Sequence, residues 1–430
     1  ELNSVLAVCD DAIEQAKRLD ASGEDLPLKG LPILIKDNIE ALGLPATAGS
    51  LALADTLVAK DSTIARRLRE AGAVIVGATN LSEWANIRST KSTSGWSAVG
   101  GLTANPWIHK HSAGGSSSGS GAAVAAGFTQ WAVGSETDGS IICPASLNGC
   151  VGIKPTVGSI PRDGMIPISA NQDSPGPMAQ TVAQAALLLD VLTGKREFAS
   201  AASQDRNLKI GVVKQWFSDD NEVSALFEGA LKALEKNGAT LVELDLTGPE
   251  EPEQDDELRV LLYELSDGLS KYLSTRPGAR VLNLQEVVNF NLESSTIELN
   301  HFGQELFDLA LEYQSEREKY VAARARNLAW AEQTLAKGLS DVDVLLGCTY
   351  APAWESTLGS GDQFRGATWI TMAPAIAGTP IGTIPMGLVQ GLPVGLGFVT
   401  GRSQESHLIT AMAAAEQALG LGVLRPTFRK

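Results

Sequence analysis

Short apolar runs that fit buried strands alternate with amphipathic helical patterns along most of the chain. Residues 31–35 and 74–76 are two such runs, and between them residues 62–71 show a helical pattern that Ser62 can cap. The same patterns predict further strands at residues 131–133, 151–153, 210–213, 241–246, 342–346, 381–384 and 394–399, and further helices at residues 3–19, 119–127, 222–236 and 405–419. Strands that alternate with helices indicate an α/β fold class.

One long stretch departs from this alternation. The chain looks helical from about residue 257 to residue 337, with little strand signal. It follows an acidic, proline-containing segment at residues 250–256, which we interpret as a solvated loop. We therefore expect a mainly helical excursion at about residues 250–340. A chain of 430 residues could hold about three domains, although one large α/β unit of this length is also ordinary.

The charge of the chain argues against polyanionic partners. Lys and Arg number 34 against 50 Asp and Glu, which gives a net charge of −16. Such a chain repels nucleic acid and anionic membrane surfaces, so we expect neither as a partner.

No apolar run approaches the ~20 residues of a membrane helix, and no signal peptide is visible. We favour a cytoplasmic location, but the chain begins at Glu1 rather than Met, so export stays open, as does the choice between a monomer and a homo-oligomer.

Cysteine and histidine patterns give no sign of a metal site or a disulfide framework. His109 and His111 are close in sequence, but no carboxylate or cysteine stands at ligand spacing from them, so we interpret them as loop residues. Neither a GxxxxGK nor a GxGxxG motif occurs in a strand-to-helix context. We expect no metal and no organic cofactor. Four cysteines without CxxC spacing are expected to be reduced and mostly buried, namely Cys9, Cys143, Cys150 and Cys348.

A serine- and glycine-rich segment is the first candidate for chemistry. Its Gly115-Ser-Ser-Ser-Gly119 part matches the GxSxG pattern of α/β-hydrolases, which would make Ser117 the nucleophile. That motif requires a strand directly before it, and residues 108–114 make a poor strand. The histidine that it also requires could only be His301 or His407. Because the pattern arises easily in a stretch this rich in Ser and Gly, we do not favour this interpretation.

A second possibility combines residues 114–121 with residues 134–144. The first run supplies hydroxyl groups on a loop that enters a helix, and the second places Ser140 on a tight turn. The backbone N–H groups that precede Ser140 could point together at one oxygen, which is the geometry of an oxyanion hole. Either run alone is more typical of an ordinary turn.

Lys36 is the third candidate. It follows the apolar run that ends at Ile35, and a lysine brought into a low-dielectric site has a lowered pKa. The neutral amine can then act as a base in a chain that has 4 histidines. A single lysine at a strand end is, however, more typical of a solvated surface.

Taken together and in this order, these segments resemble the amidase signature family. The resemblance runs from about residue 31 to the end of a predicted helix near residue 192, and it resumes from residue 374 to residue 401. It rests on the motifs Leu31-Pro-Ile-Leu-Ile-Lys-Asp-Asn38, Thr79-Asn-Leu-Ser-Glu-Trp84, Gly114-Gly-Ser-Ser-Ser-Gly-Ser120, Gly134-Ser-Glu-Thr-Asp-Gly-Ser140, Gly152-Ile-Lys-Pro-Thr156 and Gly391-Leu-Pro-Val-Gly395.

The resemblance implies a single domain over residues 1–430, in which helices flank a large, mixed, twisted β-sheet and the helical excursion covers the site. It also implies a catalytic triad of Lys36, Ser116 and Ser140, with a cis peptide bond before Ser116. Ser140 would attack the amide carbonyl and form an acyl-enzyme, while Ser116 would relay the proton of Ser140 to neutral Lys36. The oxyanion hole would consist of backbone N–H groups around Thr137, Asp138, Gly139 and Ser140.

Some positions depart from the commonest family pattern, but none of them belongs to the triad. Loss of a basic residue at Ile142 weakens the case for an acidic substrate. The departures are Asp138 where most members have Gly, Ile142 where many have Arg, Ala78 where Lys is frequent and Gln180 where Arg is usual.

The Glu-Thr-Asp-Gly-Ser turn and further segments look most like the peptide amidase branch, whose members release ammonia from C-terminal peptide amides. The further segments are Pro167-Ile-Ser169, Asp173-Ser-Pro-Gly-Pro-Met178 and His301-Phe-Gly-Gln-Glu305. We therefore expect hydrolysis of a small-molecule or peptide amide to the acid plus ammonia or an amine. Two alternatives stay open: the amidase-like component of a partner-dependent glutamine amidotransferase, which shares this fold and triad, and a general serine esterase.

Overall fold

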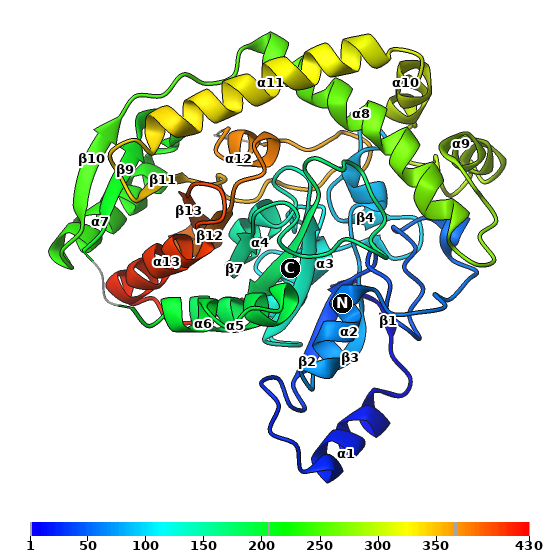
Figure 1. The fold of residues 1–430 in the computed structure, drawn as a ribbon, viewed down its shortest axis with the longest axis horizontal. Coiled ribbons are helices and arrows are strands. Elements are labelled where there is room, and N and C mark those ends of the chain that lie inside the picture. The colour runs from blue at the N-terminus through cyan, green and yellow to red at the C-terminus, as the bar shows by residue number, and fades with distance from the viewer. Residues whose placement is uncertain (1, 205–206, 365–368, 430) are drawn as a thin grey trace.

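Strands and helices alternate along much of the chain in this computed structural model (Figure 1). The structure describes residues 2–204, 207–364 and 369–429. The strands are β1 (Val5–Val8), β2 (Pro32–Lys36), β3 (Val74–Thr79), β4 (Trp96–Ser97), β5 (Gly101–Leu102), β6 (Trp131–Glu136), β7 (Val151–Lys154), β8 (Ser174–Ala179), β9 (Lys209–Val213), β10 (Thr240–Leu244), β11 (Val344–Cys348), β12 (Ile381–Val389) and β13 (Leu392–Val399). The helices are α1 (Ala12–Ser22), α2 (Thr63–Glu70), α3 (Ser118–Ala126), α4 (Ile142–Asn148), α5 (Val182–Thr193), α6 (Phe198–Ala201), α7 (Asn221–Lys236), α8 (Glu251–Ser274), α9 (Leu284–Glu293), α10 (Glu305–Tyr313), α11 (Arg317–Gly338), α12 (Met372–Ile376) and α13 (Glu405–Leu419).

The main sheet is large and mixed. It has 11 strands in the order β1-β3-β2-β6-β8-β7-β12-β13-β11-β9-β10. The pairs β2–β3 and β2–β6 are parallel, whereas β6–β8 and β12–β13 are antiparallel. The expected α/β fold class, with a large mixed sheet flanked by helices, is therefore confirmed.

Several predicted elements have nearly the predicted bounds. The strand predicted at residues 31–35 is β2, and the helix predicted at residues 405–419 is α13. Ser62 caps α2, since its side-chain oxygen accepts the N–H of Ala65 at 3.1 Å. Apolar periodicity and capping chemistry were sufficient for these elements because local sequence and burial agree there.

The N-terminal segment differs from the helix predicted over residues 3–19. Residues Val5–Val8 form the edge strand β1, which pairs antiparallel with β3, and α1 begins at Ala12. Four consecutive residues of the type Val-Leu-Ala-Val fit a strand as well as a helix. The open edge of β3 decides between them, because pairing there satisfies the backbone of both strands.

The predicted helical excursion is present as α8, α9, α10 and α11, and the described residues between 251 and 338 contain no strand. In Figure 1, α11 runs along the top of the molecule, and α8 packs against α10 and α11. The acidic run at residues 250–256 is not the predicted loop but the start of α8, where Glu250 and Glu253 form a capping box. Acidic groups stabilise this position because they accept hydrogen bonds from the unpaired N–H groups of a helix N-terminus.

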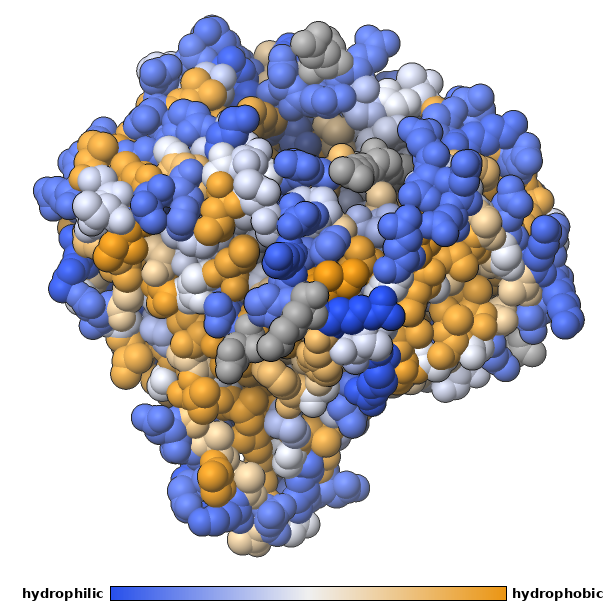
Figure 2. Space-filling view, turned by 180° about the vertical axis from the view of Figure 1, so that it is seen from behind, coloured by the Kyte–Doolittle hydropathy of each residue, from blue (hydrophilic) through white to orange (hydrophobic). Residues whose placement is uncertain are grey.

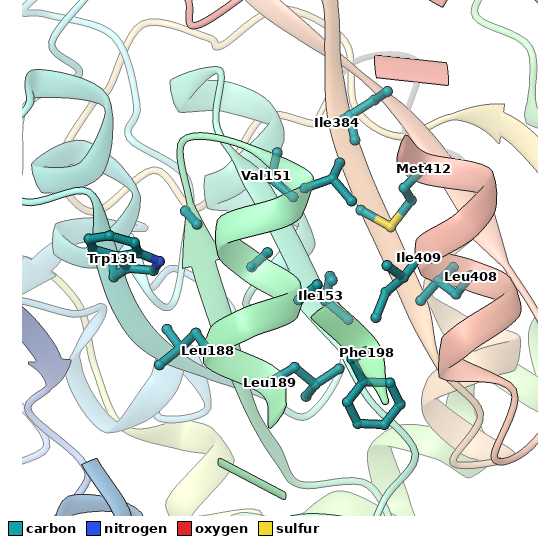
Figure 3. Packing of buried hydrophobic residues seen from close by; sticks show 14 of the residues in the cluster. Trp131, Val151, Ile153, Leu188, Leu189, Phe198, Ile384, Leu408, Ile409 and Met412 are labelled. Carbon is teal, nitrogen blue, oxygen red and sulfur yellow. The ribbon is translucent and has the colours of Figure 1, made fainter. Parts of the chain in front are cut away.

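Apolar side chains of alternate strand residues pack against helices on the two faces of the sheet. Ile33 and Ile35 belong to one buried cluster, whereas Leu34 between them belongs to another. Helices α3 and α4 contribute to the second cluster. Figure 3 shows α5 and α13 packed against β7 and β12 in the first cluster, through Val151, Ile153, Leu188, Leu189, Phe198, Ile384, Leu408, Ile409 and Met412.

Strand directions bring several chain segments to one edge of the sheet. Because β2 is parallel to both β3 and β6, the carboxyl ends of these three strands lie at the same edge. Strand β8 runs antiparallel to β6 and begins at this edge, where Ser174 pairs with Glu136. Strand β8 is not predicted by the sequence patterns, because Pro175 and Pro177 lack N–H groups and are unusual inside a sheet.

Surface hydropathy shows no single dominant apolar face in the view of Figure 2, which is seen from behind Figure 1. Hydrophilic residues gather along the upper rim, and hydrophobic residues are interspersed with polar ones across the middle. Within the described parts of the chain, no helix combines the length and the apolar character that crossing a membrane requires.

Candidate active site

Lys36 lies at the carboxyl end of β2 and is fully buried. Its Nζ is 2.8 Å from Ser116 Oγ, 3.0 Å from Ser135 Oγ and 3.1 Å from the carbonyl oxygen of Ser135. Asn38 donates through Nδ2 to the same Ser135 hydroxyl at 2.9 Å. The hydrogen-bond partners of the amine are thus hydroxyl and carbonyl oxygens rather than carboxylates.

Burial lowers the pKa of Lys36 from 10.5 to about 7, because removing an ammonium group from water disfavours its charged form. The buried carboxyl groups of Asp173 and Glu136 act in the opposite direction, since negative charge nearby favours the ammonium. Burial is the larger effect. A substantial fraction of the Lys36 amine is therefore neutral at neutral pH, which is the form that a lysine base requires.

Ser116 reaches Lys36 from the loop that precedes α3. The peptide bond between Gly115 and Ser116 is cis. The next residue, Ser117, accepts the N–H of Ser135 at 3.2 Å and donates to the Ser135 carbonyl oxygen at 3.0 Å. The Ser117 hydroxyl is fully buried and bonded to β6, so it anchors the loop and is not placed to attack a substrate.

Ser140 follows a tight turn between β6 and α4. Gly139 in this turn has φ +75°, a left-handed conformation that favours glycine, and a Cβ there would overlap the Tyr350 hydroxyl oxygen. The carbonyl oxygen of Ser140 accepts the N–H of Ser117 at 3.0 Å. This bond ties the turn that carries Ser140 directly to the loop that carries Ser116.

The buried carboxylate of Glu136 holds the other side of the turn. Its Oε2 accepts the N–H groups of Ile141 at 2.7 Å and Ile142 at 2.9 Å. By contrast, the N–H groups of Thr137, Asp138 and Ser140 donate to no backbone carbonyl in the described residues. Glu136 also accepts a hydrogen bond from the N–H of Gly139, so within the turn it leaves the N–H groups of Thr137, Asp138 and Ser140 for another acceptor.

A cavity of about 220 Å³ brings these groups together. Ser116, Ser140 and the predicted oxyanion-hole residues Thr137, Asp138 and Gly139 all line it. Lys36 is not among the lining residues and reaches the cavity through Ser116. The remaining wall consists of Ala85, Asn86, Ile87, Ser94, Gly115, Cys143, Ile168, Leu261, Tyr350, Asp362 and Phe364. Of these, Leu261 comes from α8, so the helical excursion contributes to the wall.

Asp173 supports the turn in a way that our sequence analysis did not foresee. Its carboxylate accepts from Thr137 Oγ1 at 2.7 Å and from the N–H groups of Ile168 at 2.9 Å and Ser169 at 3.0 Å. Burial raises its pKa to about 6, although these hydrogen bonds favour the ionised form. The one feature of the sequence that pointed to Asp173 was its position at the start of a family motif. Tyr350 and Asp362 belong to segments without any such signal.

Side chains that could bind a metal are not clustered. Across the described ranges, no three or more His, Cys, Asp or Glu side chains are placed to hold a metal ion together. The four cysteines are buried, as predicted. Burial lowers the pKa of His111, although Glu355 opposes this effect, so its imidazole is mainly neutral at neutral pH.

Comparison with known proteins shows which family the chain belongs to. The family model for amidases matches residues 1–409. The chain belongs to the amidase signature family. It is therefore an amidase, a hydrolase that acts on amide C–N bonds.

Family members of different activity are similar to this amidase over nearly its whole length. The crystal structure of the native peptide amidase from Stenotrophomonas maltophilia is 38% identical, with a TM-score of 0.90 over 100% of this chain and 91% of that chain. A probable amidase of Arabidopsis thaliana is 35% identical over 97% of this chain and 83% of its own length. One component of the glutamyl-tRNA(Gln) amidotransferase of Methanosarcina barkeri is 32% identical over 99% of this chain and 92% of its own length.

We predict that Gly139→Ala lowers kcat/KM for an amide substrate by roughly 100-fold or more, the magnitude typical of a damaged oxyanion hole. The new methyl group disfavours the backbone conformation of the turn and displaces Tyr350 from the cavity wall. Gly158→Ala is the matched control, because Gly158 also has a positive φ (+87°) but no atom within 4 Å of the added Cβ. In steady-state kinetics Gly139→Ala should have a much lower kcat/KM than Gly158→Ala. Equal values for the two variants would contradict a role of the Gly139 turn in catalysis.

Proposed function

We propose that this amidase hydrolyses neutral carboxamides, with C-terminal peptide amides as its preferred class, and that it does so without a partner protein. The observation that carries the proposal is the 2.8 Å contact between Lys36 Nζ and Ser116 Oγ, at a cavity that Ser140 also lines. In this proposal Lys36 is the base, Ser116 the relay and Ser140 the nucleophile.

In the first half of the reaction, Ser140 Oγ attacks the carboxamide carbon. Its proton passes to Ser116 while Ser116 gives its own proton to neutral Lys36. Negative charge develops on the carbonyl oxygen, where the N–H groups of the turn at residues 137–140 receive it. When the C–N bond breaks, the same relay returns the proton to the leaving nitrogen, so ammonia departs neutral and an ester to Ser140 remains.

In the second half, water attacks the ester carbon of the acyl-enzyme. One proton of the water passes through Ser116 to Lys36, and the oxyanion forms again at the same turn. Collapse of this intermediate breaks the bond to Ser140 Oγ, which recovers its proton from the relay. The product is the carboxylic acid, and the enzyme returns to its starting protonation state.

The cavity wall supports a neutral substrate over free glutamine. The described residues that line the cavity include no Lys or Arg, so the α-carboxylate of glutamine would meet no cationic partner among them. Asp138 and Asp362 line the same cavity and would repel that carboxylate. The 38% identity to a peptide amidase supports the same substrate class. The 32% identity to an amidotransferase component favours the alternative, in which glutamine is the amide donor. An ester could use the same nucleophile, so esterase activity is compatible with the proposal.

We predict that a fluorophosphonate probe modifies Ser140 and that Ser140→Ala hydrolyses no amide while remaining folded. The activated hydroxyl is the atom that the probe phosphonylates, and alanine removes it without adding bulk. Peptide mapping by mass spectrometry locates the adduct, and circular dichroism checks the fold of the variant. Modification at Ser117 would instead restore the GxSxG interpretation.

We also predict that kcat/KM for a neutral amide falls as the pH drops through about 7, the pKa of Lys36, and is constant above it. The sign follows from the chemistry, since the protonated amine cannot accept a proton. Lys36→Ala should be almost inactive throughout. Activity recovered after return to alkaline pH controls for unfolding in acid. A profile that stays flat across the neutral range would remove Lys36 as the base.

The deciding experiment compares a blocked peptide amide with free glutamine, using the purified chain and measured ammonia release. We expect a higher kcat/KM for the peptide amide with no ATP, tRNA or second protein present. If ammonia is released from glutamine alone, and only after an amidotransferase partner and tRNA are added, then the amidotransferase alternative replaces this proposal.

A further inference from the structure

Asp362 presents a carboxylate to the catalytic cavity. Its Oδ1 accepts the N–H of Ser94 at 2.9 Å, and its Oδ2 accepts from Ser94 Oγ at 2.6 Å and from Asn86 Nδ2 at 3.0 Å. All three residues line the cavity that Ser140 also lines. The carboxylate is therefore fixed in orientation by groups of the cavity wall itself.

This carboxylate has capacity to bind one more donor. Two carboxylate oxygens provide about four acceptor sites, and the three hydrogen bonds from Ser94 and Asn86 use three of them. Among the described residues of the cavity wall there is no Lys or Arg that would neutralise the charge, and burial raises the pKa of Asp362. A partly buried carboxylate without a cation gains most from a ligand that supplies an N–H group or a positive charge.

The size and the walls of the cavity limit which part of a substrate lies there. About 220 Å³ is below the ~300–1,000 Å³ typical of sites for drug-sized ligands, so the cavity suits the reacting carboxamide and the residue that carries it. Ile87, Ile168 and Leu261 provide an apolar wall for a side chain. The remaining polar group of such a residue is its α-nitrogen, two bonds from the carbon that Ser140 would attack.

We propose that Asp362 determines specificity by accepting a hydrogen bond from the α-nitrogen of the substrate residue that carries the amide. This inference rests on the proposed function and refines it. The preferred substrates are α-amino and α-acylamino carboxamides rather than simple aliphatic amides. The donor is either a peptide N–H or a free α-ammonium, and these two forms share the chemistry that Asp362 recognises.

The test compares three amides that have the same isobutyl side chain. N-acetylleucinamide has a peptide N–H, leucinamide has an α-ammonium, and 4-methylpentanamide has hydrogen in place of the α-nitrogen. We expect the wild-type enzyme to prefer at least one nitrogen-bearing amide over 4-methylpentanamide by about 10- to 100-fold in kcat/KM, the range for a hydrogen bond to a charged group. Which of the two is preferred distinguishes the peptide N–H from the ammonium.

Variants of Asp362 distinguish a role in substrate recognition from a purely structural role in the cavity wall. Asp362→Ala should lower kcat/KM for the preferred nitrogen-bearing amide more than for 4-methylpentanamide, which reduces the preference to within about threefold. Asp362→Asn, which removes the charge at nearly constant size, should reduce the preference most for leucinamide. Asp341→Asn is the control, since Asp341 is exposed between α11 and β11. An equal loss with all three amides, or an unchanged preference in both variants, would overturn the proposal.

The wild-type measurement keeps the proposal testable even if neither variant folds, since equal rates with the three amides would refute it directly. That result, together with an inactive Ser140→Ala enzyme, would refute the role of Asp362 and leave amide hydrolysis intact. Failure of the wild-type enzyme to release ammonia from any of the three, or from a blocked peptide amide, would refute the proposed function and this inference with it.

Discussion

The removal of the Lys36 amine from water is the constraint on which the site depends. In contact with solvent this amine would be charged at neutral pH and could not accept a proton. At the carboxyl end of β2 it is buried, and its partners are Ser116 and the hydroxyl and carbonyl oxygens of Ser135. These oxygens satisfy the polar hydrogens of the amine without the opposite charge that would hold it protonated. Packing around β2, rather than any single partner, therefore lowers the pKa of Lys36, as its proposed role as a base requires.

The arrangement of strands explains how residues far apart in the chain reach this amine. The parallel strands β2 and β6 end at the same edge, which places Lys36 beside Ser135 and Glu136. Ser117 then fixes the preceding Ser116 to β6, and the Glu136 carboxylate fixes the start of α4 just after Ser140. Strand β6 thus positions both the loop that carries Ser116 and the turn that carries Ser140, and so fixes the two relative to each other.

Local patterns in the sequence were enough for β2, for α2 with its Ser62 cap and for α13, because each is specified by its own apolar pattern. They failed for β1 and for the acidic start of α8, where pairing with β3 and capping by Glu250 decide the conformation. Of the candidate site, Lys36, Ser116 and Ser140 were predicted from family motifs, and the fold brings them to one place. Asp362 could not, since its relation to Ser94 is created by the fold and joins segments 268 residues apart.

Charge within the cavity bears on the base as well as on substrate choice. Asp173 and Glu136 favour the protonated form of Lys36 and so oppose the effect of its burial. Asp362 is not among the groups that shift the pKa of Lys36, so a substrate bound at Asp362 affects that carboxylate rather than the lysine. An α-ammonium would hold Asp362 ionised, since opposite charge stabilises a carboxylate. An uncharged peptide N–H would bind the same carboxylate without this effect. Charge therefore acts twice in the proposed site, because the buried carboxyl groups of Asp173 and Glu136 act on Lys36 while Asp362 acts on the choice of substrate.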